Sequence, residues 1–155
     1  MSILFLVSSA LVKRYLSEAG SAWVVAVTNP PTENAIVVAE ITRVEAAAAI
    51  AARHRAPSGI SRIERDELVQ LLLRHFDDEY DLAALTPKII SRAVALTQSH
   101  RLRGYDAIQL ATALDVHETA VAAGLGSVTF VAADDDLIAA ARVEGLAADN
   151  PNRRN

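Results

Sequence analysis

Runs of apolar residues alternate along this chain with amphipathic segments, a pattern that predicts strands followed by helices. Residues 3–7 form a continuous apolar run bounded by two serines, and residues 35–38 form a second short run. Both are typical of strands buried on two faces. Residues 127–132 predict a third strand and residues 80–85 a weaker fourth. Because strands buried on both faces need helices on both sides, we expect a mostly parallel central sheet in an α/β fold.

Helix signals fill the segments between these runs. Spacing and propensity predict helices over residues 10–12, 39–55, 61–76, 86–99, 105–116 and 137–144. The third of these begins with the capping-box spacing of Ser61 and Glu64, and the fourth with Thr86-Pro87, a cap followed by proline at the first helical position. Gly145 ends the last helix. Strands and helices therefore alternate along the chain.

Length and composition limit the class of protein. The chain has 155 residues, 52% hydrophobic and 22% charged, which is typical of one folded domain and excludes intrinsic disorder. We assign residues 1–148 to that domain and residues 149–155 to a frayed polar C-terminal tail. With 15 basic against 19 acidic residues the net charge is −4, so a nucleic acid would have to bind through a local patch.

Several absences from the sequence narrow the chemistry. The chain has no cysteine, which excludes disulfides, thiolate nucleophiles and cysteine-bound zinc, so any metal would be held by oxygen. Phosphate-binding glycine loops, the dinucleotide fingerprint, the zinc-protease helix and the nucleophile elbow are also missing. The apolar segments 3–12 and 119–133 are too short to span a bilayer, and no basic residue precedes the first. We therefore expect a mature, soluble, cytoplasmic protein with no membrane partner.

One carboxylate lies within the apolar face of the helix predicted at 39–55. Ile41 and Val44 belong to a helical stripe of apolar residues, and Glu45 lies within that stripe. Two interpretations are open: Thr42 and Glu45 form a capping box, or Glu45 points toward a partner such as a metal ion or an arginine. The second gains weight because burying an unpaired carboxylate costs several kcal/mol.

Two more acidic positions stand at predicted helix starts. Asp106 begins the fifth predicted helix and either caps it or serves a site. Asp134, Asp135 and Asp136 follow the strand at 127–132, and one of them should cap the last helix. Three adjacent carboxylates exceed the need of one cap, and a bound cation would relieve their mutual repulsion.

Glu45, Asp106 and Asp134 thus come from three segments of one α/β chain. In such folds ligands gather at the carboxyl ends of the strands, so we expect these side chains to converge there. Hard oxygen ligands suit Mg²⁺ or Mn²⁺. Such an ion supports phosphodiester hydrolysis, because it activates water and neutralises charge that develops on the phosphate oxygens.

Four blocks of the sequence, residues 5–15, 40–45, 103–111 and 130–137, resemble in this order the motifs of the PIN domain. Within that family they are most similar to the VapC-type toxins of bacterial toxin–antitoxin pairs. The resemblance implies a three-layer α/β/α PIN-like fold and a Mg²⁺- or Mn²⁺-dependent endoribonuclease that acts on RNA. It also implies a toxin that is inhibited by a cognate antitoxin and often forms a homodimer.

The resemblance also implies roles for single residues. Glu45, Asp106 and Asp134 would be the catalytic residues and metal ligands, with Asp136 as an additional ligand. Ser9 would lie beside the site, where it would fix the first helical turn or a metal-bound water.

The chain departs from the PIN pattern at Val7. Members of the family carry an aspartate there, at the carboxyl end of the first strand, as a central metal ligand, and valine cannot coordinate a cation. A loss of about 3 kcal/mol would lower the affinity for the metal more than a hundredfold. We therefore predict an impaired or inactive nuclease. Natural loss of the ligand and a deliberate inactivating substitution both lead to this pattern, and removing the charge would also reduce repulsion within the fold.

Two hypotheses follow for the function. The first is a PIN-fold ribonuclease toxin with a compromised metal site. The second is a catalytically silent PIN-fold protein that binds an antitoxin or a dimer partner. A phosphatase of the haloacid-dehalogenase type is disfavoured, because it needs an aspartate nucleophile where Val7 stands.

Basic and aromatic residues near the motifs are candidate contacts for RNA. The basic candidates are Lys13, Arg14, Arg43, Arg53 and Arg55. Solvated helix faces explain most arginines of this kind. We expect Tyr15 and Tyr105 to pack in the protein rather than stack on bases, and we expect the four histidines to lie at the surface.

Overall fold

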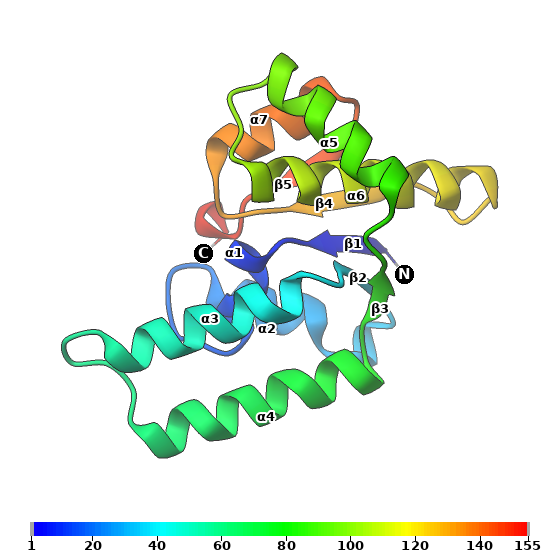
Figure 1. The fold of residues 1–155 in the computed structure, drawn as a ribbon. Coiled ribbons are helices and arrows are strands. Elements are labelled where there is room, and N and C mark those ends of the chain that lie inside the picture. The colour runs from blue at the N-terminus through cyan, green and yellow to red at the C-terminus, as the bar shows by residue number, and fades with distance from the viewer. Residues whose placement is uncertain (1, 155) are drawn as a thin grey trace.

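The strands form an all-parallel sheet in the computed structural model, which describes residues 2–154. Across the sheet lie β3 (Asp81–Ala83), β2 (Ala35–Ala39), β1 (Ile3–Leu6), β4 (Val128–Val131) and β5 (Ala147–Asp149), in that order (Figure 1). Each neighbouring pair is parallel, and the register sets Phe5 of β1 opposite Val37 of β2 and Phe130 of β4. The predicted α/β class with a parallel central sheet is confirmed.

Helices cover both faces of this sheet (Figure 1). One face carries α5 (Pro87–Ser99), α6 (Gly104–Ala122) and α7 (Asp135–Val143). The other carries α1 (Ser8–Leu11), α2 (Ser21–Thr28), α3 (Thr42–Arg55) and α4 (Arg62–Asp78). Short 3₁₀ turns are η1 (Val12–Arg14), η2 (Pro30–Thr32) and η3 (Pro151–Arg153). The predicted three-layer α/β/α arrangement is therefore confirmed.

Strand β1 shows how the sequence produces two cores. Successive strand side chains point to opposite faces, so Phe5 joins the apolar cluster under α5, α6 and α7, whereas Leu4 and Leu6 join the cluster under α1 to α4. Phe5 stacks on Phe130 with ring centroids 6.0 Å apart. A continuous apolar run is thus required at β1, because neither face of this strand meets water.

Most helix boundaries follow the predicted signals. Ser61 caps α4 by accepting a hydrogen bond from the backbone N–H of Glu64, and Thr86 caps α5 in the same way from Ile89. The helix predicted from residue 39 begins instead at Thr42, because residues 35–39 are all used in β2.

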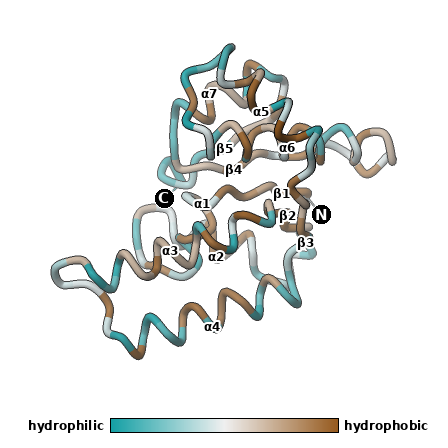
Figure 2. Tube along the Cα trace, viewed as in Figure 1, coloured by the Kyte–Doolittle hydropathy of each residue, from teal (hydrophilic) through white to brown (hydrophobic). Residues whose placement is uncertain are grey.

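The outer layer beside α3 is formed by α4. Figure 2 shows hydrophobic and hydrophilic positions alternating along this helix, as expected when one stripe faces a neighbour and the rest faces water. Leu72 and Phe76 are its buried residues, and α3 is the element that it packs against. The helix α4 therefore packs on the domain through Leu72 and Phe76, with the partly buried Leu68, Val69 and Leu71 beside them.

Two elements have no counterpart in the sequence-based prediction. The apolar segment that forms α2 was not assigned as a helix, and β5 lies where the polar tail was expected to begin. The described part of residues 149–155 is not frayed. Asn150 is buried and caps η3, and Arg153 and Arg154 pair with Asp135 and Asp149. Ion pairs and a buried cap hold this segment, and a composition rule does not detect such contacts.

Candidate functional site

Four carboxylates from three helices line one pocket at the carboxyl edge of the sheet. The pocket has a volume of about 930 Å³, and its acidic lining residues are Glu45, Asp106, Asp134 and Asp136. Glu45 comes from α3 and Asp106 from α6, while Asp134 and Asp136 lie at the start of α7. The convergence that we expected from the sequence is therefore present.

Glu45 is held by donors from two other elements. Ser8 Oγ of α1 donates to Glu45 Oε2 at 3.1 Å, and Gln109 Nε2 of α6 donates to Glu45 Oε1 at 2.9 Å. The same Gln109 nitrogen donates to Thr42 Oγ1 at 2.8 Å. Thr42 makes no cap bond to α3, so the capping-box interpretation of Thr42 and Glu45 is wrong. Glu45 is instead fixed toward the pocket by side chains far away in sequence.

Gln109 is the residue of this site that sequence reasoning missed. It is 2% exposed, and its Oε1 has no hydrogen-bond partner among the described residues. Leaving a buried acceptor unpaired costs about 1–3 kcal/mol. The available signal was its position three residues after Asp106, on the same helix face, a spacing that a helix cap also explains. Ser8 carried no such signal.

The acidic triplet before α7 is divided between three tasks. Asp134 caps the helix, because its Oδ1 accepts from the backbone N–H groups of Asp136 and Leu137 at 2.9 and 3.2 Å. Asp136 lines the pocket, whereas Asp135 turns toward the C-terminal segment and pairs with Arg153 at 2.8 Å. The prediction that one of the three aspartates caps the helix is confirmed, and Asp134 both caps α7 and lines the pocket.

Asp106 lies in the first turn of α6 and is not its N-cap, which is Arg103. Burial raises the pKa of Asp106 above its ordinary value, the negative charge of Asp134 raises it further, and Arg103 opposes both. The pocket therefore holds two carboxylates close enough to repel each other.

Ser9 and Val7 occupy the two supporting positions. Ser9 Oγ accepts from the backbone N–H of Ala133 at 3.0 Å, so it ties α1 to the residue immediately before Asp134. Val7 is 3% exposed and belongs to the apolar cluster that includes Ala107 and Leu110 of α6. Its side chain is packed as a core residue at the position where the PIN resemblance implies a carboxylate.

None of the five basic residues considered as candidate contacts for RNA lines the pocket. Lys13 and Arg53 both pair with Glu18, at 3.1 and 3.0 Å. Arg14 pairs with Glu79. Three other basic residues line the pocket, and all come from the loop between α5 and α6: His100, Arg101 and Arg103.

Aromatic residues and histidines also differ from the expectation. Tyr15 is buried, as predicted, but Tyr105 is 67% exposed and lines the pocket. The histidines are half-buried rather than at the surface. Each has a polar partner: Ile60 for His54, Tyr15 for His75, Glu144 for His100 and Val128 for His117.

The Mg²⁺ or Mn²⁺ ion that the resemblance implies does not fit these residues as they stand. Oxygen ligands of a suitable kind line the pocket. However, across residues 2–154 no group of three or more histidine, aspartate or glutamate side chains is placed so that it could hold a metal ion. Val7, where the resemblance implies a further ligand, is buried and does not line the pocket, and both carboxylate oxygens of Glu45 accept hydrogen bonds from protein donors.

Comparison with known proteins finds similarity in structure and none in sequence. No protein-family model matches the chain, and no curated protein matches it either. A FitAB complex bound to an IR36 DNA fragment is similar to it with a TM-score of 0.65 and 13% identity, covering 98% of this chain and 97% of the other. VapBC2 from Rickettsia felis, bound to a DNA fragment from its promoter, is similar with a TM-score of 0.59 and 14% identity, covering 96% and 98%.

These two solved structures are toxin–antitoxin complexes, and the likeness to them extends over nearly the whole chain. At such low identity the likeness shows the fold alone. The chain thus has the three-layer PIN-like architecture that its sequence motifs resemble. No helix within residues 2–154 is long and apolar enough to cross a membrane.

Proposed function

We propose that this chain is the toxin-type member of a toxin–antitoxin pair, built on a Mg²⁺- or Mn²⁺-dependent ribonuclease fold whose site is disabled at Val7. The observation that carries the proposal is the pocket itself, in which Glu45, Asp106 and Asp134 converge from separate elements. The likeness to two toxin–antitoxin complexes supports the same assignment. Expected partners are a cognate antitoxin, an RNA substrate and a second copy of the chain, in the cytoplasm.

The residues present explain why the unmodified chain should cut RNA poorly. Each oxygen of the Glu45 carboxylate already accepts one hydrogen bond, from Ser8 or from Gln109, and a buried aliphatic side chain stands at position 7. The same observations favour the second candidate function, a silent PIN-fold protein that retains binding to an antitoxin. The two candidates differ in what a restored carboxylate at position 7 would do.

The test is the Val7→Asp variant, assayed for cleavage of fluorescent single-stranded RNA while Mn²⁺ and Mg²⁺ are titrated in the absence of antitoxin. We expect cleavage to rise about a hundredfold or more over the native chain, the effect of about 3 kcal/mol of added ligand binding. The matched control is the double variant Val7→Asp, Asp134→Asn. Asparagine preserves the α7 cap but removes the charge, so this control should stay inactive.

A silent Val7→Asp chain that still binds its antitoxin would reject the ribonuclease scaffold and leave the binding protein. Efficient metal-driven cleavage by the unmodified chain would contradict the assigned effect of Val7.

A further inference from the structure

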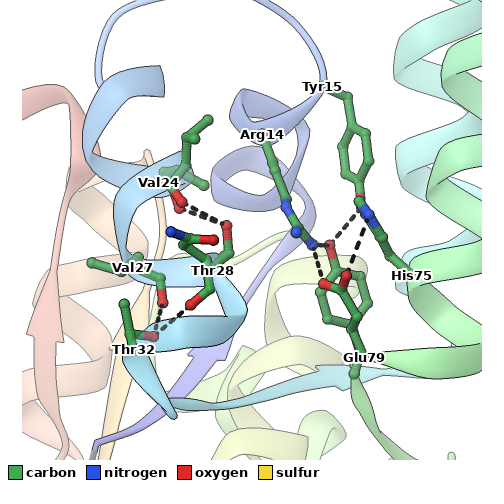
Figure 3. Close-up of polar contacts among 11 residues, drawn as sticks. Arg14, Tyr15, Val24, Val27, Thr28, Thr32, His75 and Glu79 are labelled. Carbon is green, nitrogen blue, oxygen red and sulfur yellow. Dashed lines mark hydrogen bonds and ion pairs between the residues drawn. The ribbon is translucent and has the colours of Figure 1, made fainter.

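A second polar cluster lies on the opposite side of the sheet from α6, where α4 meets the first helical turns. Its members come from two parts of the chain. One part is the end of η1 with the residue that follows it, and the other is the last turn of α4 with the two residues between α4 and β3. Figure 3 shows Arg14, Tyr15, His75 and Glu79 turned toward one another. We name the five side chains the α4 anchor: Arg14, Tyr15, His75, Glu79 and Tyr80.

The α4 anchor is a chain of short contacts with little access to water. Arg14 Nη1 donates to Tyr80 Oη at 2.7 Å and pairs with Glu79 Oε2 at 2.9 Å. The hydroxyls of Tyr80 and Tyr15 lie 2.5 Å apart, and the Tyr15 hydroxyl lies 2.7 Å from His75 Nδ1. Both tyrosines are 7% exposed, and the His75 side chain is 14% exposed. Each contact therefore needs a correctly placed proton.

The number of protons available along the chain of contacts favours a neutral His75. Three contacts run along the chain, from Arg14 to Tyr80, from Tyr80 to Tyr15 and from Tyr15 to His75. Arg14 can only donate to Tyr80. When the Tyr80 proton goes to Tyr15 and the Tyr15 proton to His75 Nδ1, each hydroxyl of the chain both accepts and donates. Three protons serve three contacts when Nδ1 is an acceptor, which makes His75 neutral. A protonated Nδ1 would bring a fourth proton, and one buried phenol would then have no acceptor.

The charges around His75 act in both directions, and burial decides the result. Arg14 from η1 and Arg74 on α4 disfavour a positive imidazole, whereas Glu79, whose Oε1 lies 3.6 Å from Nε2, and Asp78 favour it. Burial is the largest effect, and together with Arg14 it lowers the pKa of His75 below its ordinary value. From α3, Arg43 lies over the neighbouring Phe76 ring, 5.3 Å from its centroid.

We propose that the α4 anchor is a pH-sensitive switch: with His75 neutral it holds the C-terminal end of α4 against η1, and protonation of His75 releases that end. The apolar contact of α4 with the domain is made by the buried Leu72 and Phe76 and by the partly buried Leu68, Val69 and Leu71. The α4 anchor adds a polar contact at the C-terminal end of this helix. A groove of about 630 Å³ lies beside the anchor, lined by Tyr15 of the anchor and by Leu68, Leu71 and Arg74 of α4. Release of α4 would change the shape of this groove, whether or not the chain cuts RNA.

The test is amide hydrogen exchange, comparing α4 (Arg62–Asp78) with α6 (Gly104–Ala122) at about pH 7.5 and about pH 5.5, on either side of the ordinary histidine pKa. After correction for the intrinsic effect of pH, protection of the last turns of α4 should fall about tenfold at the lower pH, the effect of one lost buried hydrogen bond. Protection of α6 should not change. Equal protection of α4 at both pH values would overturn the proposal.

The control is His75→Gln, whose side chain is neutral at both pH values, so α4 should then be equally protected at both. A pH effect that persists in His75→Gln would assign the switch to another group. If this variant does not fold, the imidazole C–H signals of His75 give a second measurement. Tyr15→Phe should raise the pKa of His75, because the donor that favours the neutral ring is removed, whereas the exposed Tyr105→Phe should not. An unchanged pKa in Tyr15→Phe would reject the mechanism.

Discussion

In the acidic pocket four carboxylates lie near two arginines, and next to Glu45 the buried amide oxygen of Gln109 has no partner within residues 2–154. In the α4 anchor, by contrast, every contact has one donor and one acceptor. Both clusters join residues that are distant in sequence. The difference is that the pocket carries unpaired negative charge while the anchor is balanced by Arg14 and Glu79. Unpaired charge is expected where a ligand completes the site, and balanced charge where the contact is structural.

Among the variants that test this difference, Val7→Asp should change the free energy of unfolding most. Without divalent cations we expect the free energy of unfolding to fall by about 3 kcal/mol, because a buried aliphatic side chain is lost and a further carboxylate joins the acidic groups. Mn²⁺ should restore part of the loss by binding the folded state. Urea denaturation with and without Mn²⁺ measures both effects. Val7→Asn is the matched control: it should lose stability without any response to Mn²⁺. A Val7→Asp chain as stable as the native one would show that position 7 is remote from the carboxylates.

Tyr80→Phe makes the corresponding change in the α4 anchor. Loss of the hydroxyl removes the acceptor for Arg14 and the donor for Tyr15, so we expect the free energy of unfolding to fall by about 2 kcal/mol. Tyr105→Phe removes the same atom from an exposed ring and should change stability by less than about 0.5 kcal/mol. Chemical denaturation above pH 7 compares the two variants. Equal effects would mean that the anchor contributes no more than a surface hydroxyl.

The two clusters also differ in how far the sequence predicts them. Asp134 was recognised because it follows a buried strand, where ligands of α/β folds gather. Asp106 was recognised because it begins a predicted helix, and Glu45 because it lies within an apolar helical stripe. The α4 anchor left no such signal, since Tyr15 and His75 lie 60 positions apart and meet only because α4 packs beside η1. The same limit applies to Ser8. Local patterns predict elements and their ends, whereas partners across elements depend on tertiary packing.

The alternation of apolar runs with amphipathic segments predicted the three layers and the parallel sheet, because strands that are buried on two faces are continuously apolar. It did not predict β5, which has three residues and half-exposed side chains. Partners of the basic residues were not predicted for a related reason. Lys13 and Arg53 are both drawn to Glu18, and one carboxylate that pairs with two cations has no signature in a single segment.

Asp106→Asn should change the free energy of unfolding least. Whether the variant gains or loses stability distinguishes a pocket with unpaired charge from a balanced cluster such as the α4 anchor. The raised pKa of Asp106 means that the folded chain binds this proton more tightly than the unfolded chain. The stability that it contributes is therefore fully present below pH 3.8 and is lost as the pH rises through the folded pKa. At neutral pH the charged group is a cost, so Asp106→Asn should stabilise the protein there. The gain should stay below about 1 kcal/mol, because the pocket is open to water.

Glu118→Gln should have the opposite effect on stability at neutral pH. Arg92 donates to both carboxylate oxygens of Glu118, at 3.0 and 2.7 Å, and these hydrogen bonds lower the pKa of Glu118. Its contribution is present above pH 4.5 and is lost as the pH falls, so Glu118→Gln should weaken the protein at neutral pH. Urea denaturation between about pH 4 and about pH 7 would follow both variants across the carboxylate range. We expect opposite signs for the two changes in stability. Burial and the charge of Asp134 disfavour the ionised form of Asp106, whereas Arg92 stabilises the ionised form of Glu118. A loss of stability in Asp106→Asn at neutral pH would show that the pocket, like the α4 anchor, is already balanced without a cation.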